Sequence, residues 1–178
     1  MMKRLPTDRT VFQNAWVVED CEKTCLKWAN EMGVGPFFIT EYNDQFTEMT
    51  YRGKPAKLGM IIGIAQAGNV QIEIIQPTVD QCAYRDSVPK GSSGFHHMCV
   101  WTHDIEADTA WFEKLGYPAA NLGKVGPDMS FAYYDTRPLM GCMLEVVTWS
   151  PGVEERFAQI AHAAKDWDGK DPIRGRSA

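Results

Sequence analysis

The sequence predicts an α+β fold made of two similar halves, each a strand, a helix and about three further strands, followed by one more helix at the C-terminal end. An internal repeat is the first observation behind this, because the segment that begins at Gln13 matches the segment that begins at His97. The second is that strand-like runs follow both copies. The third is a single glutamate in the last apolar run of each half, Glu73 and Glu145.

Each copy of the repeat opens with an apolar, β-favouring run and continues with helical spacing. Asp20 and Asp104 suit the N-cap of these helices, because a short side-chain oxygen can accept a hydrogen bond from an unpaired amide there. Gly33 and Gly116 are natural stops, since glycine readily takes the left-handed conformation that ends helices. These signals predict helices over residues 21–32 and 105–115.

Further strand candidates follow each helix as apolar runs bounded by turn residues. They lie at 36–41, 46–51, 58–66 and 70–76 in the first half and at 118–125, 130–135 and 142–149 in the second. Residues 78–93 have the composition of a surface connection, residues 151–167 have helical spacing, and residues 168–178 read as a loose tail. We therefore expect one domain over 1–178, with modules at 10–77 and 94–150.

Composition and charge narrow the class of protein. The net charge of -5 and the lack of a basic stripe argue against a nucleic-acid binder. The longest apolar stretch, 59–67, is too short to cross a bilayer, and no apolar run follows the basic N-terminus, so we expect no membrane contact and a cytoplasmic location. The five cysteines form no CxxC pair and are expected to be packed thiols, including Cys21 and Cys25 on one helix face.

Glu73 and Glu145 are lone carboxylates inside strongly apolar strands. A buried, unpaired carboxylate is costly, so such groups are paired, protonated or bound to a metal. The alternative is that each glutamate lies on an open, solvated face of an antiparallel strand.

Gln13 and His97 occupy equivalent positions in the first strands of the two halves. His96 precedes His97, and neighbours in a strand face opposite ways, so only one of them can join a given site. If a pseudo-two-fold axis relates the halves, the polar residue of each first strand and the glutamate of each last strand converge on one cleft. Two carboxylates, an imidazole and an amide oxygen suit Zn, Mn, Fe(II), Co or Ni. The repeat therefore predicts a divalent-metal site.

Aromatic and basic side chains supply candidates for binding a substrate beside this site. The aromatic candidates on predicted strands are Trp16, Trp101, Phe131, Tyr133 and Tyr134, of which alternation allows only about half to face one pocket. The basic residues that could contact an anionic substrate are Arg52, Lys54, Lys57 and Arg137, although such residues are mostly solvated.

Four segments carry a resemblance to a known family, and they lie at 13–20, 71–77, 94–100 and 141–147. In order and spacing they resemble the vicinal oxygen chelate superfamily. That superfamily includes glyoxalase I, methylmalonyl-CoA epimerase, extradiol dioxygenases and the bleomycin and fosfomycin resistance proteins. The resemblance covers residues 11–150 and looks closest to the epimerase-like branch.

The resemblance implies two βαβββ modules whose curved mixed sheets enclose a metal cleft. It implies that the metal ligands are Gln13, Glu73, His97 and Glu145, with His97 rather than His96 because its register matches that of Gln13. Epimerases usually carry a histidine where this chain has Gln13, whereas the set Gln, Glu, His, Glu resembles that of zinc-type glyoxalase I. The two-His, one-carboxylate set of the dioxygenases does not match.

The expected function is that of a metal-dependent isomerase or epimerase, which removes a proton α to the carbonyl of a small molecule while the metal stabilises the enolate. Glu145 or Glu73 is the expected base. Glu48 is a further candidate, because epimerases carry a glutamate in this strand region. The alternatives are a glyoxalase I-type lyase acting on a thiol adduct of an α-ketoaldehyde, and a metal-free binding or resistance protein for an aromatic ligand. A homodimer is expected, because members of the superfamily often dimerise.

Overall fold

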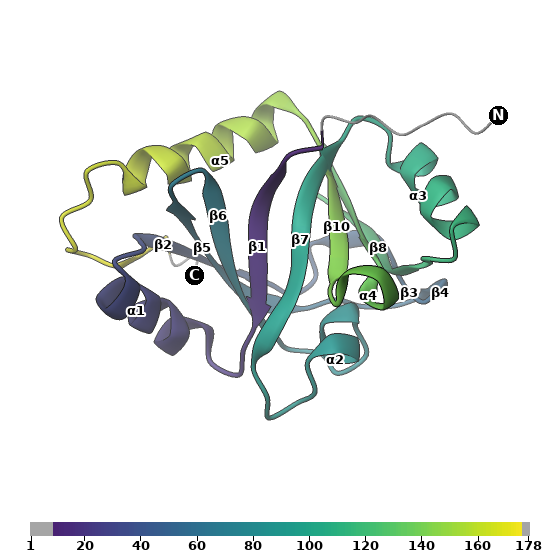
Figure 1. Cartoon of the computed structure of the whole chain (residues 1–178), viewed down its shortest axis with the longest axis horizontal. Coiled ribbons are helices and arrows are strands. Elements are labelled where there is room, and N and C mark those ends of the chain that lie inside the picture. The colour runs from purple at the N-terminus through teal and green to yellow at the C-terminus, as the bar shows by residue number, and fades with distance from the viewer. Residues whose placement is uncertain (1–8, 176–178) are drawn as a thin grey trace.

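The structure of the chain, a computed structural model that describes residues 9–175, is one curved, eleven-stranded mixed sheet with helices packed against it (Figure 1). The expectations for the first eight residues and for 176–178 lie outside that range. No helix in the described part of the chain is long and apolar enough to cross a membrane.

The two halves of the sheet repeat the same element order. The first half consists of β1 (Val11–Val17), α1 (Cys21–Met32), β2 (Phe37–Tyr42), β5 (Met60–Ala67) and β6 (Val70–Pro77). The second consists of β7 (Gly94–Thr102), α3 (Ile105–Lys114), β8 (Ala119–Val125), β9 (Met129–Tyr134) and β10 (Met143–Thr148). The strand order runs β2-β5-β6-β1 and then β7-β10-β9-β8, so each half is the counterpart of the other about the central pair β1 and β7. This arrangement confirms the α+β fold that the repeat predicted.

The register of the central strands expresses the pseudo-two-fold relation. In the antiparallel β1–β7 pair, Ala15 lies opposite His97 and Gln13 lies opposite Cys99. The repeat makes Gln13 equivalent to His97 and Ala15 equivalent to Cys99, so the pseudo-two-fold axis relates these two pairs to each other. Glu73 on β6 lies opposite Ala15, and its counterpart Glu145 on β10 lies opposite Cys99. The two glutamates therefore occupy equivalent positions on either side of the centre.

One strand of the first half belongs to the edge of the second. β3 (Phe46–Tyr51) leaves β2 and pairs with β8, and the short β4 (Lys54–Pro55) pairs with β3 beyond it. The β3–β8 register shifts between Thr47 and Thr50, and Met49 at this irregularity is buried against Gly123, where a Cβ would lie 2.4 Å from the Met49 sulfur. One of the four strands that the sequence predicted for the first half thus joins the two halves.

The helix caps follow the sequence prediction. Asp20 accepts a hydrogen bond from the Lys23 amide and Asp104 from the Ala107 amide, while Gly33 ends α1 in the left-handed conformation with φ of 66°. All five cysteines are free and buried, as expected for packed thiols.

Several elements differ from the sequence prediction. The connection between the halves contains a short helix, α2 (Ala83–Ser87), and a second short helix, α4 (Arg137–Met140), precedes β10. The C-terminal helix α5 spans Pro151–Ala164 and so ends before the predicted residue 167, because the backbone becomes extended at Lys165. The prediction of a loose tail is wrong for β11 (Ile173–Arg174), which pairs with β2 because the tail folds back and the Trp167 ring packs against Gly35.

Candidate metal and substrate site

Three ligand-type side chains meet at the centre of the sheet. Glu73, His97 and Glu145 are buried, and one ligand atom from each lies within 4.8 Å of the others. The Nε2 atom of His97 is 3.1 Å from a Glu145 oxygen and 3.5 Å from a Glu73 oxygen. Alternation along three different strands, β6, β7 and β10, directs these side chains to the same face. The solvated-face alternative is therefore excluded for both glutamates.

Gln13 opens onto the same cavity as the two glutamates and is itself buried. Its amide nitrogen donates a 3.2 Å hydrogen bond to the Gln71 side-chain oxygen. Since that nitrogen is engaged, the amide oxygen is the atom that Gln13 can offer to a cation.

The buried His96 determines which nitrogen of His97 carries a proton. His96 Nε2 lies 3.0 Å from the Ala83 carbonyl oxygen, and its Nδ1 lies 2.8 Å from Nδ1 of His97. A carbonyl only accepts, so His96 Nε2 donates to it. Burial, followed by the neighbouring His97, lowers the pKa of His96 to about 3, so the ring is neutral and its Nδ1 accepts. The donor in the second bond is consequently Nδ1–H of His97.

A cation fits the resulting donor set. Because Nδ1 is engaged with His96, Nε2 is the His97 nitrogen that can offer a lone pair to a cation, and this buried atom has no hydrogen-bond partner in the described part of the chain. Burial and the charge of Glu145 raise the pKa of Glu73 well above its usual value. Burial also acts to raise the pKa of Glu145, but the His97 ring and hydrogen bonds from Cys99 and Tyr133 outweigh it and leave that pKa lowered. A divalent cation would neutralise both carboxylates and engage the imidazole lone pair.

The cluster opens onto a cavity of about 250 Å³ with a predominantly apolar lining. Strands of both halves contribute to it, and α5 contributes Arg156, Phe157, Gln159 and Ile160. Since the outer face of the sheet takes no part in this lining, the concave face carries the site.

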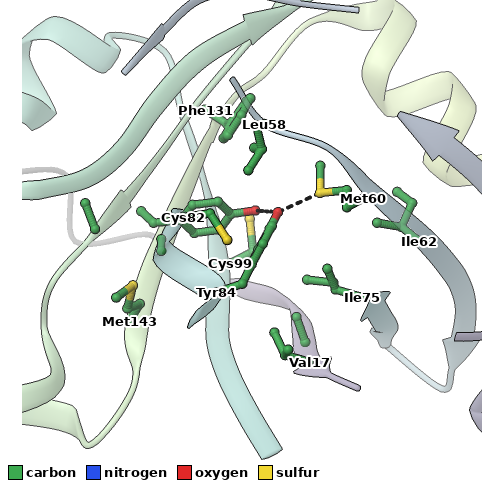
Figure 2. Close-up of a cluster of buried hydrophobic side chains, with 14 of the residues drawn as sticks. Val17, Leu58, Met60, Ile62, Ile75, Cys82, Tyr84, Cys99, Phe131 and Met143 are labelled. Atoms are coloured by element: carbon green, nitrogen blue, oxygen red, sulfur yellow. Dashed lines mark hydrogen bonds between the residues drawn. The ribbon is translucent and has the colours of Figure 1, made fainter. Parts of the chain in front are cut away.

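Tyr133 brings a hydroxyl group into this cavity beside the cluster. Its ring centroid lies 5.0 Å from that of His97, and its hydroxyl lies 2.9 Å from the hydroxyl of Tyr84. Tyr84 in turn donates to the Met60 sulfur at 2.8 Å, as Figure 2 shows. Burial and the charge of Glu145 raise the pKa of Tyr133 well above its usual value, so the hydroxyl keeps its proton at neutral pH.

Of the other predicted site residues, Phe131 and Tyr133 line the cavity, whereas Glu48, Trp16 and Trp101 do not. The Glu48 side chain is 66% exposed and pairs with Lys124 at 2.8 Å, because the irregularity in β3 turns it outward. Trp16 alternates with Gln13 and so packs against Trp28 of α1 on the opposite face.

The remaining candidates have structural partners of their own. Trp101 does not line the cavity itself, but it stacks on Phe12 at 4.1 Å and packs against the lining residue Phe157. Tyr134 stacks on Phe112 at 4.3 Å. The basic candidates Arg52, Lys54, Lys57 and Arg137 also lie outside the cavity lining. Arg52 and Arg137 both pair with Asp135.

Sequence reasoning missed most of the apolar lining, and also polar lining residues such as Tyr42 and Arg156. The helical spacing over 151–167 predicted the helix that carries Arg156, but no local signal shows which part of the sheet that helix covers.

The comparisons with known proteins agree with this geometry. A family model described as the Glyoxalase/Bleomycin resistance protein/Dioxygenase superfamily matches residues 12–133. No curated protein sequence matches the chain significantly.

Several solved structures share the fold. A hypothetical protein from Bacillus halodurans C-125 is similar with a TM-score of 0.61 and 14% identity, over 81% of this chain and 96% of its own. Methylmalonyl-CoA epimerase from Mycobacterium tuberculosis has a TM-score of 0.54 and 13% identity, over 81% of this chain and 90% of its own. A methylmalonyl-CoA epimerase in complex with methylmalonyl-CoA and NH4+ has a TM-score of 0.50 and 16% identity, over 80% of this chain and 96% of its own.

Proposed function

The chain belongs to the glyoxalase/bleomycin resistance protein/dioxygenase superfamily, and from that premise we propose that it is a metal-dependent isomerase or epimerase of a small carbonyl compound. The observation that carries the proposal is the buried cluster of Glu73, His97 and Glu145 at an apolar cavity. An apolar cavity that contains titratable groups suits proton transfer to and from carbon. The fold shared with methylmalonyl-CoA epimerases supports the same class of reaction.

The proposed ligands of a divalent cation are Glu73, His97, Glu145 and the amide oxygen of Gln13. When bound there, the cation would act as a Lewis acid and stabilise the negative charge that develops on a carbonyl oxygen.

Glu145 is the proposed base, because its carboxylate lines the cavity beside the proposed cation site and can accept a proton from the carbon next to the carbonyl. Glu73 is the alternative base. Return of the proton to the opposite face of the carbon would complete an epimerisation, and its return to a neighbouring atom would complete an isomerisation.

Exchange of the substrate α-hydrogen in deuterated water tests this proposal. We expect the metal-loaded protein to catalyse exchange in at least one member of a panel of acyl thioesters and hydroxy-carbonyl compounds. Glu145→Gln should abolish the exchange, whereas the matched control Glu113→Gln, which changes an exposed glutamate of α3, should retain it. No exchange with any substrate of the panel would contradict the proposal.

A glyoxalase I-type lyase is the second candidate, because Gln13 lines the same cavity as both glutamates and so completes the Gln, Glu, His, Glu set. Glutathione-dependent consumption of methylglyoxal without exchange on the panel would favour this reaction. A protein that binds the panel compounds but takes up no metal would instead be a binding protein.

A further inference from the structure

Helix α5 is an addition to the two repeated modules that covers the cavity. It follows β10 of the second half but packs against β5 of the first, and Figure 1 shows it crossing the strands of that half. The helix buries its own residues Val153 and Ile160, and its residues Phe157 and Ile160 line the cavity. The helix lies beyond the residues 12–133 that match the family model. It therefore shapes the cavity in a way that the matched part of the chain does not.

Arg156 of α5 is the only lysine or arginine among the residues that line the cavity, within the part of the chain that the structure describes. Its guanidinium lies 5.7 Å from the centre of the Phe157 ring and 3.4 Å from the Met129 sulfur. Neither of these neighbours carries a charge, and no carboxylate of the described residues forms an ion pair with it. The guanidinium is therefore available to an anion.

Arg156, which is exposed on α5, carries the one charge of the described cavity lining that a divalent cation at the cluster would not offset. Glu73, Glu145 and Arg156 are the charged lining residues among those described. A divalent cation would offset the two carboxylates, which leaves the charge of Arg156. Tyr42 also lines this cavity, and its pKa, raised mainly by burial, is lowered by Arg156 and raised by Glu73. Arg156 and the two glutamates of the cluster therefore line one cavity.

From this arrangement we infer that the substrate is an apolar carbonyl compound with a free carboxylate, and that Arg156 is the residue that binds the carboxylate. The inference rests on the proposed function. The guanidinium of Arg156 matches one anionic group, because a planar guanidinium pairs with a carboxylate through two parallel hydrogen bonds. The cavity of about 250 Å³ and its apolar walls suit a compact hydrocarbon body between that group and the carbonyl.

Binding of a matched pair of probes tests the inference. The probes are 3-phenylpropionate and its neutral amide, 3-phenylpropionamide, titrated calorimetrically into metal-loaded and chelator-treated protein. We expect both forms of the protein to bind the carboxylate about tenfold more tightly than the amide. Arg156→Gln should remove this preference and Arg156→Lys should restore part of it. The control Lys165→Gln, which removes an exposed charge at the end of the same helix, should leave it unchanged.

Equal affinity for the two probes, or a preference that survives in Arg156→Gln, would overturn the inference. A preference that disappears on chelation alone would also overturn it, because the carboxylate would then bind the metal. The two proposals can fail separately. The proposed function fails if no α-hydrogen exchange occurs, and that result can be obtained even when the carboxylate preference depends on Arg156.

Discussion

Among single residues, His96 orients a residue of the site although it does not line the cavity itself. Its Nδ1 accepts a hydrogen bond from Nδ1–H of His97, and its Nε2 donates a hydrogen bond to the Ala83 carbonyl oxygen of α2. A histidine that ligates a metal usually donates its other ring N–H to such a partner, which holds the tautomer and the ring orientation. The proposed metal site therefore depends on a residue that contributes no ligand.

We expect His96→Phe to lower the affinity for a divalent cation by roughly 10- to 100-fold, because His97 loses the acceptor that holds Nε2 unprotonated. Competition with a chromophoric chelator measures the affinity. His96→Gln retains an acceptor and should recover part of it, while the control His162→Gln changes an exposed histidine and should have no effect. Unchanged affinity in a folded His96→Phe protein would contradict this role.

At the scale of elements, helix α1 approaches β5 closely at one glycine. A Cβ on Gly63 would lie 2.4 Å from the Cys25 sulfur and 3.5 Å from the Cys21 sulfur. The two cysteines of the helix face are therefore packing groups, and the small residue on the strand sets the distance between helix and sheet.

We expect Gly63→Ala to lower the free energy of unfolding by about 1–3 kcal/mol, because the added methyl group overpacks this contact. Urea unfolding measures the change. Gly152→Ala is the matched control, since a Cβ there meets nothing within 4 Å, and it should leave the stability unchanged or slightly raised. Equal stability of Gly63→Ala and the wild type would show that α1 can move away from the sheet.

A charge network joins elements of the two halves outside the cavity. Asp135, after β9, is bonded to Arg137 and to Arg52, and Arg52 also binds Asp86 of α2. The hydrogen bonds from Arg137, together with those from Arg52, lower the pKa of Asp135 to about 2. A carboxyl group whose pKa is depressed by folding stabilises the protein above its unfolded pKa, and this contribution is lost as the pH falls toward the folded value.

We expect Asp135→Asn to lower the free energy of unfolding at pH 7 by about 1 kcal/mol. The difference from the wild type should shrink as the pH falls from about 4 toward 2, which urea unfolding at several pH values can follow. The control Asp80→Asn breaks an exposed pair with Lys90 and should change the stability little. A difference that stays constant with pH would contradict the assignment to the charge of Asp135.

For the whole molecule, the proposed metal site joins the two halves. Gln13 and Glu73 belong to the first half, and His97 and Glu145 belong to the second. The halves otherwise meet at the β1–β7 pair and through β3, which reaches the far edge of the sheet. A cation bound between them would favour the folded, joined arrangement over the unfolded chain.

We expect a divalent cation at 100 times its dissociation constant to raise the free energy of unfolding by about 2.7 kcal/mol, in a single cooperative transition. Differential scanning calorimetry with and without the cation measures this, and a chelator should reverse it. Glu145→Gln should remove the effect, whereas Glu113→Gln should retain it. Stabilisation that persists in Glu145→Gln would place the cation elsewhere in the molecule.

Local patterns in the sequence determined much of this molecule. The repeat, the capping aspartates, the glycine stop at Gly33 and the apolar runs depend on interactions between near neighbours, so they predicted the halves and most elements. The cost of burying a carboxylate singled out Glu73 and Glu145.

The tertiary structure decided which side chains meet. Alternation sent Trp16 to α1, the irregularity in β3 turned Glu48 to the surface, and the path of α5 across the sheet brought Arg156 to the cavity. These outcomes depend on contacts between residues far apart in the chain, as does the His96 link to Ala83. The sequence by itself therefore determined a two-half fold and the residues of the proposed metal site, whereas only long-range packing decided the shape and charge of the cavity beside it.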